Sequence, residues 1–168
     1  MGAPDVEPLV APHILEYTYT RSTGPALGEF LGGLRDRRII GRRGSDGRVL
    51  VPPSDYDPVT SEDLTESVEV ADAGTVTTWA SNDHPFEGQP LDRPFAWALV
   101  RLDGADTGLL AAVDVPDASA MSTGMRVTAR WADERVGSIT DLKCFYPQED
   151  APSGRVSAGA PEKPEGAA

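Results

Sequence analysis

The sequence predicts a mostly β protein with one N-terminal helix, a small hairpin and a closed barrel of short strands. A single segment near the N-terminus has helical periodicity. From Leu64 to Pro147, short β-rich runs alternate with turn residues. The 168 residues include 17 glycines and 15 prolines, an enrichment that indicates many turns, and this length suggests a single hydrophobic core.

Both ends of the chain are expected to lack regular structure. Residues 1–12 carry three prolines, and residues 148–168 have no large apolar residue beyond Val156. We therefore expect disorder in both segments. Residues 13–20 (HILEYTYT) are expected to be extended, because alternating residues then fall on opposite faces.

The helix is expected over residues 25–38 (PALGEFLGGLRDRR). Its large apolar residues follow the i, i+3, i+4, i+7 spacing of one stripe, which favours core packing over a partner interface: Leu27, Phe30, Leu31 and Leu34. Gly28 and Gly32 share the neighbouring stripe with Arg35. An interior glycine costs a helix about 1 kcal/mol relative to alanine. We therefore expect packing to stabilise this helix, including close contact with another backbone or a ligand.

A hairpin and a barrel are expected after the helix. Ser45-Asp46-Gly47 predicts a tight turn between Ile39-Ile40 and Val49-Leu50-Val51. The later β-rich runs are ESVEVADAG, TVTTWASN, PFAWALVRLDGAD, GLLAAVDV, MRVTARWADE and SITDLKCFYP. In the fifth run Val127, Ala129 and Trp131 alternate with polar residues, as in a half-buried strand. Five or six short strands over about 85 residues suit a small closed barrel, and the OB-fold is one such barrel.

Composition and charge exclude several classes of partner. The chain has 15 basic and 27 acidic residues and a net charge of −12, which disfavours binding to nucleic acid or to anionic lipid. Trp79, Trp97 and Trp131 lie in expected strands, where a core or interface role is favoured over stacking on bases. The chain shows neither a secretory signal nor an apolar run of about 18 residues. We expect a cytoplasmic protein with no nucleic-acid or membrane partner.

No familiar catalytic set is present. The one cysteine, Cys144, and the two histidines, His13 and His84, cannot form an internal disulfide or a Cys/His zinc site. Asp83-His84 is either an acid/base pair or part of a surface loop, and the loop is favoured. Cys144 is favoured as a small buried residue over a nucleophile. The acidic run matches no calcium loop and is interpreted as a solvated surface: Asp55, Asp57, Glu62, Asp63, Glu66, Glu69 and Asp72.

Arginines cluster just before this acidic run. Six lie within fourteen positions, and no Lys or Arg occurs between Arg48 and Arg93: Arg35, Arg37, Arg38, Arg42, Arg43 and Arg48. Guanidinium groups bind phosphate in a bidentate manner, so the cluster could hold a nucleotide or coenzyme A. The alternatives are internal neutralisation of the acidic run and a docking face for an acidic partner. The sequence leaves all three open.

The order of these elements carries a family resemblance. The helix EFLGGLRDRRIIG, the hairpin GRRGSDGRVLVPP, the link SDYDPVT and a barrel ending MRVTARW…FYP resemble the zinc-ribbon OB-fold acyl-CoA-associated family, a domain of unknown function. In that family the hairpin carries a C-x-x-C pair and a second pair follows, and together they hold zinc. Here Gly44 and Gly47 occupy the positions of the first pair, and SDYDPVT has no cysteine. Zinc is therefore not expected, and the ribbon shape is expected to persist without it.

The resemblance covers about residues 13–147 and implies a fold and a role. The fold is mostly β: an N-terminal helix plus a metal-free rubredoxin-like hairpin in residues 13–63, then an OB-fold barrel in residues 64–147. The cysteine-free form is similar to actinobacterial members that accompany lipid-transfer-protein-type thiolases and aldolases. It implies a non-catalytic subunit of a hetero-oligomer with a thiolase-fold enzyme, which helps to bind or channel acyl-CoA in steroid or lipid side-chain degradation.

The resemblance assigns no individual site residues. From their position after the helix, we expect Arg35, Arg38, Arg42 and Arg43, with Gly28 and Gly32, to contact a phosphate or the partner. The competing hypothesis is a stand-alone acyl-CoA-binding protein, or an enzyme acting on the thioester through Asp57, His84 or Cys144.

Overall fold

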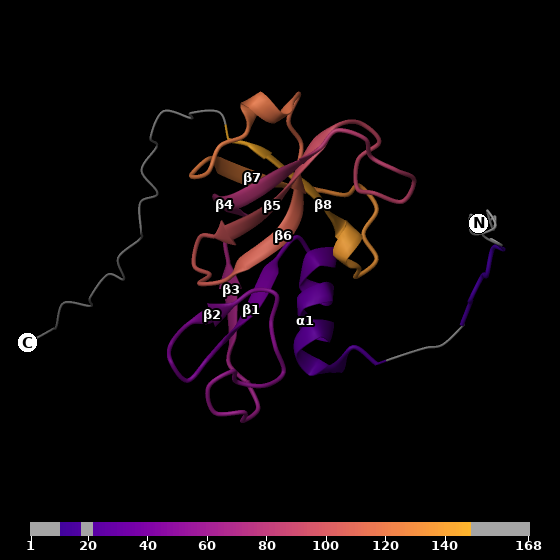
Figure 1. The fold of residues 1–168 in the computed structure, drawn as a ribbon. Coiled ribbons are helices and arrows are strands. Elements are labelled where there is room, and N and C mark those ends of the chain that lie inside the picture. The colour runs from indigo at the N-terminus through magenta and orange to yellow at the C-terminus, as the bar shows by residue number, and fades with distance from the viewer. Residues whose placement is uncertain (1–10, 18–21, 149–168) are drawn as a thin grey trace, which may run out of the picture.

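The computed structural model describes residues 11–17 and 22–148 (Figure 1). The disorder expected at the two ends falls almost entirely on residues 1–10 and 149–168, outside the described residues, as do residues 18–21 of the expected extended segment. Residues 11–17 belong to no helix or strand, and their side chains are exposed.

Within the described residues, one α-helix and eight strands make up two neighbouring modules. The ribbon module lies below the barrel in Figure 1. The ribbon module contains α1 (Gly24–Arg35), β1 (Ile39–Arg43), β2 (Val49–Leu50) and β3 (Ser67–Val70). The barrel contains β4 (Ala73–Asn82), β5 (Phe95–Leu102), β6 (Gly108–Val113), β7 (Arg126–Trp131) and β8 (Leu142–Pro147). Two short 3₁₀ turns, η1 (Ala118–Ala120) and η2 (Ile139–Asp141), connect barrel strands.

Helix α1 ends three residues earlier than the sequence predicts. Arg37 has a φ of 59°, in the left-handed region that ends helices, and the Arg38 amide donates back to the Gly33 carbonyl at 2.8 Å. A residue distant in sequence caps the first turn of α1: Oδ1 of Asp55 accepts a hydrogen bond from the Ala26 amide at 3.1 Å.

The buried face of α1 is rotated relative to the predicted stripe. Phe30 and Leu34 are buried as expected, and Leu31 packs partly against the core. Leu27 is 38% exposed, and Ala26 is buried in its place. Gly33 rather than Gly28 or Gly32 makes the close backbone approach, since a Cβ at Gly33 would lie 2.9 Å from the Arg38 carbonyl oxygen.

Strand β1 forms the centre of a three-stranded sheet in the order β2-β1-β3. The predicted hairpin is present, with Arg42 opposite Leu50 and Arg43 opposite Val49. Strand β3 also pairs with β1, from Ile39 opposite Val70 to Arg42 opposite Ser67. The sequence predicts that residues 64–147 form the barrel. The first strand of that segment, β3, belongs instead to the three-stranded sheet of the ribbon module.

The barrel has the strand order β4-β5-β6-β8-β7 and closes through pairing of β4 with β7. All pairs are antiparallel except β6 with β8, which is parallel and joined at Val113 and Phe145. A closed five-stranded barrel with this order is consistent with an OB-fold. The predicted fold class is thereby confirmed.

One main core joins the two modules. It contains Phe30 and Leu34 of α1 together with Val100, Val127 and Phe145 of the barrel. The edge of β2 is bonded to the turn before β6, because the Val49 amide donates to Asp106 Oδ2 at 2.8 Å and the Val51 amide to Thr107 Oγ1 at 2.7 Å. Among the helices of the described residues, none is long and apolar enough to cross a membrane.

Candidate functional site

All four singled-out arginines form ion pairs within the ribbon module, and three of these pairs join residues distant in sequence. Arg38 donates twice to Glu69, at 2.8 and 2.6 Å, and this contact holds the pKa of the Glu69 carboxyl below its usual value. Arg43 pairs with Glu66 at 2.8 Å. These acidic residues belong to the run that follows the arginines in the sequence. The alternative of internal neutralisation therefore accounts for this part of the cluster.

Arg42 is the most enclosed of the four, with a side chain only 9% exposed. Its guanidinium pairs with Glu29 of α1 at 2.8 Å and donates to the Thr65 carbonyl at 2.7 Å and to Ser67 Oγ at 2.8 Å. These contacts fasten the helix to β1 and β3. Few guanidinium hydrogens remain for a phosphate.

A hollow of about 460 Å³ lies beside Arg42, between the start of α1 and the loop of residues 55–65. Its lining includes the carboxyl groups of Asp55 and Asp63. Two carboxylates next to an arginine that is already paired disfavour a phosphate here. Arg35 is more open. Its side chain is 56% exposed, and its one ion pair with a described residue is with its neighbour Asp36.

The helix face that carries Gly28 and Gly32 points away from the core. A Cβ at Gly32 would have no atom within 4 Å, and one at Gly28 would meet only the Thr23 hydroxyl at 3.2 Å. Leu27 adds a partly exposed apolar side chain to the same end of the helix. Among the residues that the structure describes, no contact requires a glycine at position 32, and only the Thr23 hydroxyl crowds position 28. The contact of Gly28, Gly32 and the four arginines with a phosphate or a partner remains a prediction.

A buried carboxylate connects the hairpin turn of the ribbon module to the loop that follows the hairpin. Asp57, 4% exposed, accepts hydrogen bonds from the amides of Ser45 at 2.6 Å, Val59 at 2.7 Å and Thr60 at 3.2 Å. These backbone bonds, led by that of Ser45, lower the pKa of Asp57 to about 2. The carboxylate therefore joins the turn at Gly44–Gly47 to the loop that replaces the second cysteine pair.

The residues of this ribbon do not fit zinc. Gly44 and Gly47 offer no side-chain ligand, and the oxygens of Asp57 are already engaged by backbone amides. Among residues 11–17 and 22–148 no group of three or more His, Cys, Asp or Glu side chains is arranged to hold a metal ion.

The three groups considered for catalysis lie in separate places. His84 is exposed in the loop between β4 and β5, Asp57 is in the ribbon, and Cys144 is buried in β8. Burial raises the pKa of the Cys144 thiol, which lowers the fraction of reactive thiolate. The structure does not bring these residues together.

A second apolar cluster lies outside the barrel, and sequence reasoning missed it. Leu91, Phe95, Ala112 and Cys144 are buried there, and Trp97 packs against them. Phe95 and Trp97 form an edge-to-face pair with ring centroids 5.2 Å apart. The run PFAWAL was the available signal, because it is apolar on both faces of a strand, which indicates burial on both sides.

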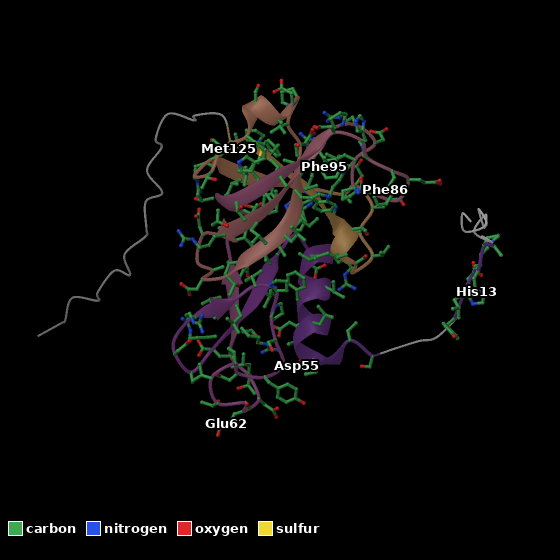
Figure 2. All side chains as sticks on the ribbon, in the orientation of Figure 1. His13, Asp55, Glu62, Phe86, Phe95 and Met125 are labelled. Carbon is green, nitrogen blue, oxygen red and sulfur yellow. The ribbon has the colours of Figure 1, made fainter. Side chains whose placement is uncertain are left out.

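An open pocket continues this outer cluster. It has a volume of about 390 Å³ and is lined by β5, β6 and β8, by η2 and by residues 88–90 of the loop before β5. In Figure 2, the labels of Phe86 and Phe95 mark that loop and the start of β5. The lining is mostly apolar, with Lys143 as its charged residue.

Part of the chain, including most of the barrel, is similar to a known protein domain. Residues 67–132 match the model of the C-terminal OB-fold domain of ChsH2. A search of curated proteins found no match to this sequence.

Two solved structures are similar over most of the chain. A protein of unknown function of the DUF35 family from Sulfolobus solfataricus shares 27% identity and a TM-score of 0.52, covering 64% of this chain and 77% of that one. A chain of the Ltp2-ChsH2(DUF35) aldolase shares 21% identity and a TM-score of 0.57, covering 76% of this chain and 98% of that one. The described part of this protein thus has the fold of a DUF35-type protein with a ChsH2-like barrel.

Proposed function

We propose that this protein is a non-catalytic accessory subunit, which binds a thiolase-fold enzyme of the lipid-transfer-protein type and helps that enzyme to bind or channel acyl-CoA. The observation that carries the proposal is the similarity of this chain to nearly the whole of one chain of the Ltp2-ChsH2(DUF35) aldolase. The ChsH2-like barrel adds independent support. The family model and this structure both carry the name ChsH2, and the name of the structure adds an aldolase with Ltp2 as the second component.

The chemistry of the candidate catalytic residues supports an accessory role. Asp57 is a poor general base. Hydrogen bonds from backbone amides stabilise its ionised form and lower its pKa to about 2, so it has little tendency to accept a proton. Cys144 is a poor nucleophile, because its buried thiol has a raised pKa. A role in binding requires neither group to react.

The finer assignment rests on the sequence resemblance. The cysteine-free hairpin and the Y-D-P link are similar to actinobacterial family members, and we place the partner's reaction in the breakdown of steroid or other lipid side chains. The exposed α1 face with Gly32 is our candidate for the contact with the partner, since a bare backbone can approach another chain closely.

The test begins with the tagged protein as bait in a lysate of its native host at low salt. We expect a thiolase-fold polypeptide to be retained in stoichiometric amount and identified by mass spectrometry. The two chains are then co-expressed, and the mass of the complex is measured by light scattering after size-exclusion chromatography. The enzyme should be less soluble or less active when produced without this chain.

Two results would oppose the proposal. One is a thiolase that is fully active alone and does not form a complex with this chain when the two are co-expressed. The other is turnover of an acyl-CoA thioester by the isolated protein that disappears on substitution of Asp57, His84 or Cys144. The second result would favour the stand-alone enzyme.

A further inference from the structure

The outer surface of the barrel is apolar along β5 and β6. Residues at alternate positions of a strand point to opposite faces, and Ala98 and Val100 of β5 point inward to the core. Trp97 and Leu99 therefore point outward. Leu99 lies opposite Leu110 of β6, and their side chains are 37% and 62% exposed. A barrel that faced only water would carry polar residues at these positions.

The protein's own loop covers only part of this apolar surface. The loop between β4 and β5 contributes Leu91, which is 8% exposed and packs with Phe95 and Cys144. Beside this covered part the surface remains open as the pocket of about 390 Å³. That volume is within the range of about 300–1,000 Å³ found for small-molecule sites.

The walls of the pocket suit an elongated apolar body. Leu109 to Ala112 of β6 form one side, Leu142 of β8 and Ile139 of η2 form another, and Gly88 to Pro90 form a third. Ile139 is 51% exposed at the rim. Burying these side chains against an apolar ligand would remove apolar surface from water, which favours binding.

The pocket also carries a cation that has no ion-pair partner among the residues that the structure describes. Lys143 is the only lysine among residues 11–17 and 22–148, and it forms no ion pair with any residue of these segments. Cys144 follows Lys143 on β8 and lies opposite Arg130 of β7. Arg93 and Arg130 share the single carboxylate of Asp114, at 2.7 and 2.6 Å. This region is thus locally positive on a chain with a net charge of −12.

We propose that the pocket between β6, β8 and the loop before β5 binds an anionic amphiphile, with the apolar body in the hollow and the anionic group paired with Lys143. The choice of acyl compounds as ligands rests on the proposed function, whereas the pocket and Lys143 are observed independently of it. The same chemistry is found in a free fatty acid and in an acyl-CoA thioester, so the experiment compares the two. The site is distinct from the arginine cluster of the ribbon.

The test is titration calorimetry on the isolated protein at low salt, with laurate, lauroyl-CoA and the neutral analogue dodecanol. We expect one molecule of an anionic ligand to bind per chain, and dodecanol to bind more weakly. The tighter of laurate and lauroyl-CoA identifies the source of the anionic group. Lys143→Gln should weaken binding of the anions by up to about fivefold and leave dodecanol unchanged. The matched control is Arg101→Gln, which removes an exposed cation of β5 that does not line the pocket.

Two further variants test the location. Thr140→Trp fills the hollow from an exposed position of η2, and Ile139→Asp places a negative charge at its rim. Each should weaken anion binding at least about tenfold. Val136→Asp is the control, because Val136 is 79% exposed and does not line the pocket.

The proposal is overturned if neither anion binds the wild-type protein, if Thr140→Trp and Ile139→Asp bind as well as wild type, or if dodecanol binds as tightly as laurate and Lys143→Gln has no effect. None of these results bears on whether the protein forms a complex with a thiolase-fold enzyme, which is measured separately.

Discussion

The backbone amide of Ser45 donates a hydrogen bond of 2.6 Å to Oδ2 of Asp57, and this contact joins the two turns of the ribbon. Oδ1 of the same carboxylate accepts from the amides of Val59 and Thr60. One buried carboxylate with three backbone donors therefore links the hairpin turn to the loop that follows it.

The first prediction concerns Asp57→Asn. Its amide NH₂ group would face backbone N–H donors, so at least one hydrogen bond is lost and two donors oppose each other. We expect the melting temperature, followed by circular dichroism, to fall by several degrees. Asp63→Asn is the control, because Asp63 is exposed in the same loop. A chelator should leave the wild-type melting temperature unchanged, and a chelator-induced drop would contradict a metal-free ribbon.

The second prediction concerns acid stability. The pKa of Asp57 is lowered from 3.8 to about 2 in the folded protein. Because the folded value lies below the unfolded one, the carboxylate contributes stability above pH 4, and this contribution is lost as the pH falls from about 4 to about 2. Urea midpoints measured between pH 6 and pH 2.5 should decline less steeply in Asp57→Asn than in wild type. Parallel declines would exclude Asp57 as a source of the acid sensitivity.

The third prediction compares two adjacent helical glycines. Gly32→Ala adds a Cβ in open space and should stabilise the isolated protein by about 0.5–1 kcal/mol, because alanine favours the helix. Gly33→Ala brings a Cβ within 2.9 Å of the Arg38 carbonyl oxygen and should destabilise it by about 1–3 kcal/mol. Urea unfolding of each variant and of the wild-type protein measures both changes.

The same position tests the contact with a partner. Gly32→Gln should fold as well as wild type yet reduce co-purification with the thiolase-fold enzyme, if this face meets the partner's backbone. A complex that forms equally well with Gly32→Gln would remove the α1 face from the interface and would leave the accessory role to be tested elsewhere on the surface.

Local sequence patterns predicted most of the helices and strands. The features that they did not predict depend on pairing between strands that are distant in sequence. The alternation in residues 126–131 was sufficient for β7, and the turn at Ser45-Asp46-Gly47 for the first hairpin. The partners of the arginines could not be predicted, because Arg38 and Glu69 are 31 positions apart and meet only when β3 pairs with β1. The pocket was missed for a similar reason, since strands distant in sequence, a loop and η2 form its walls.

The fourth prediction separates structural from exposed arginines. Arg42→Met removes the partner of Glu29 and the donors to Thr65 and Ser67, and we expect a loss of about 2–3 kcal/mol. The Arg42 side chain is only 9% exposed and makes charge-assisted hydrogen bonds, whereas the Glu29 side chain is 38% exposed and keeps contact with water. Arg35→Gln should change stability by less than about 0.5 kcal/mol, because its pair with Asp36 is exposed. If Arg35→Gln, Arg38→Gln and Arg43→Gln all leave both acyl-CoA affinity and complex formation unchanged, these three have no ligand or partner role.

The last prediction concerns Cys144 and decides between an accessory subunit and a thioester-acting enzyme. The thiol is 1% exposed within the outer cluster, and burial raises its pKa, so little thiolate forms at neutral pH. We expect Ellman's reagent to modify Cys144 in the native protein far more slowly than in urea, and the rate to follow global or local opening. Cys144→Ala should retain complex formation and the effect on the partner's activity, because the residue acts only through packing. Rapid modification of the folded protein, together with loss of thioester turnover in Cys144→Ala, would instead identify a nucleophile and reverse the proposed function.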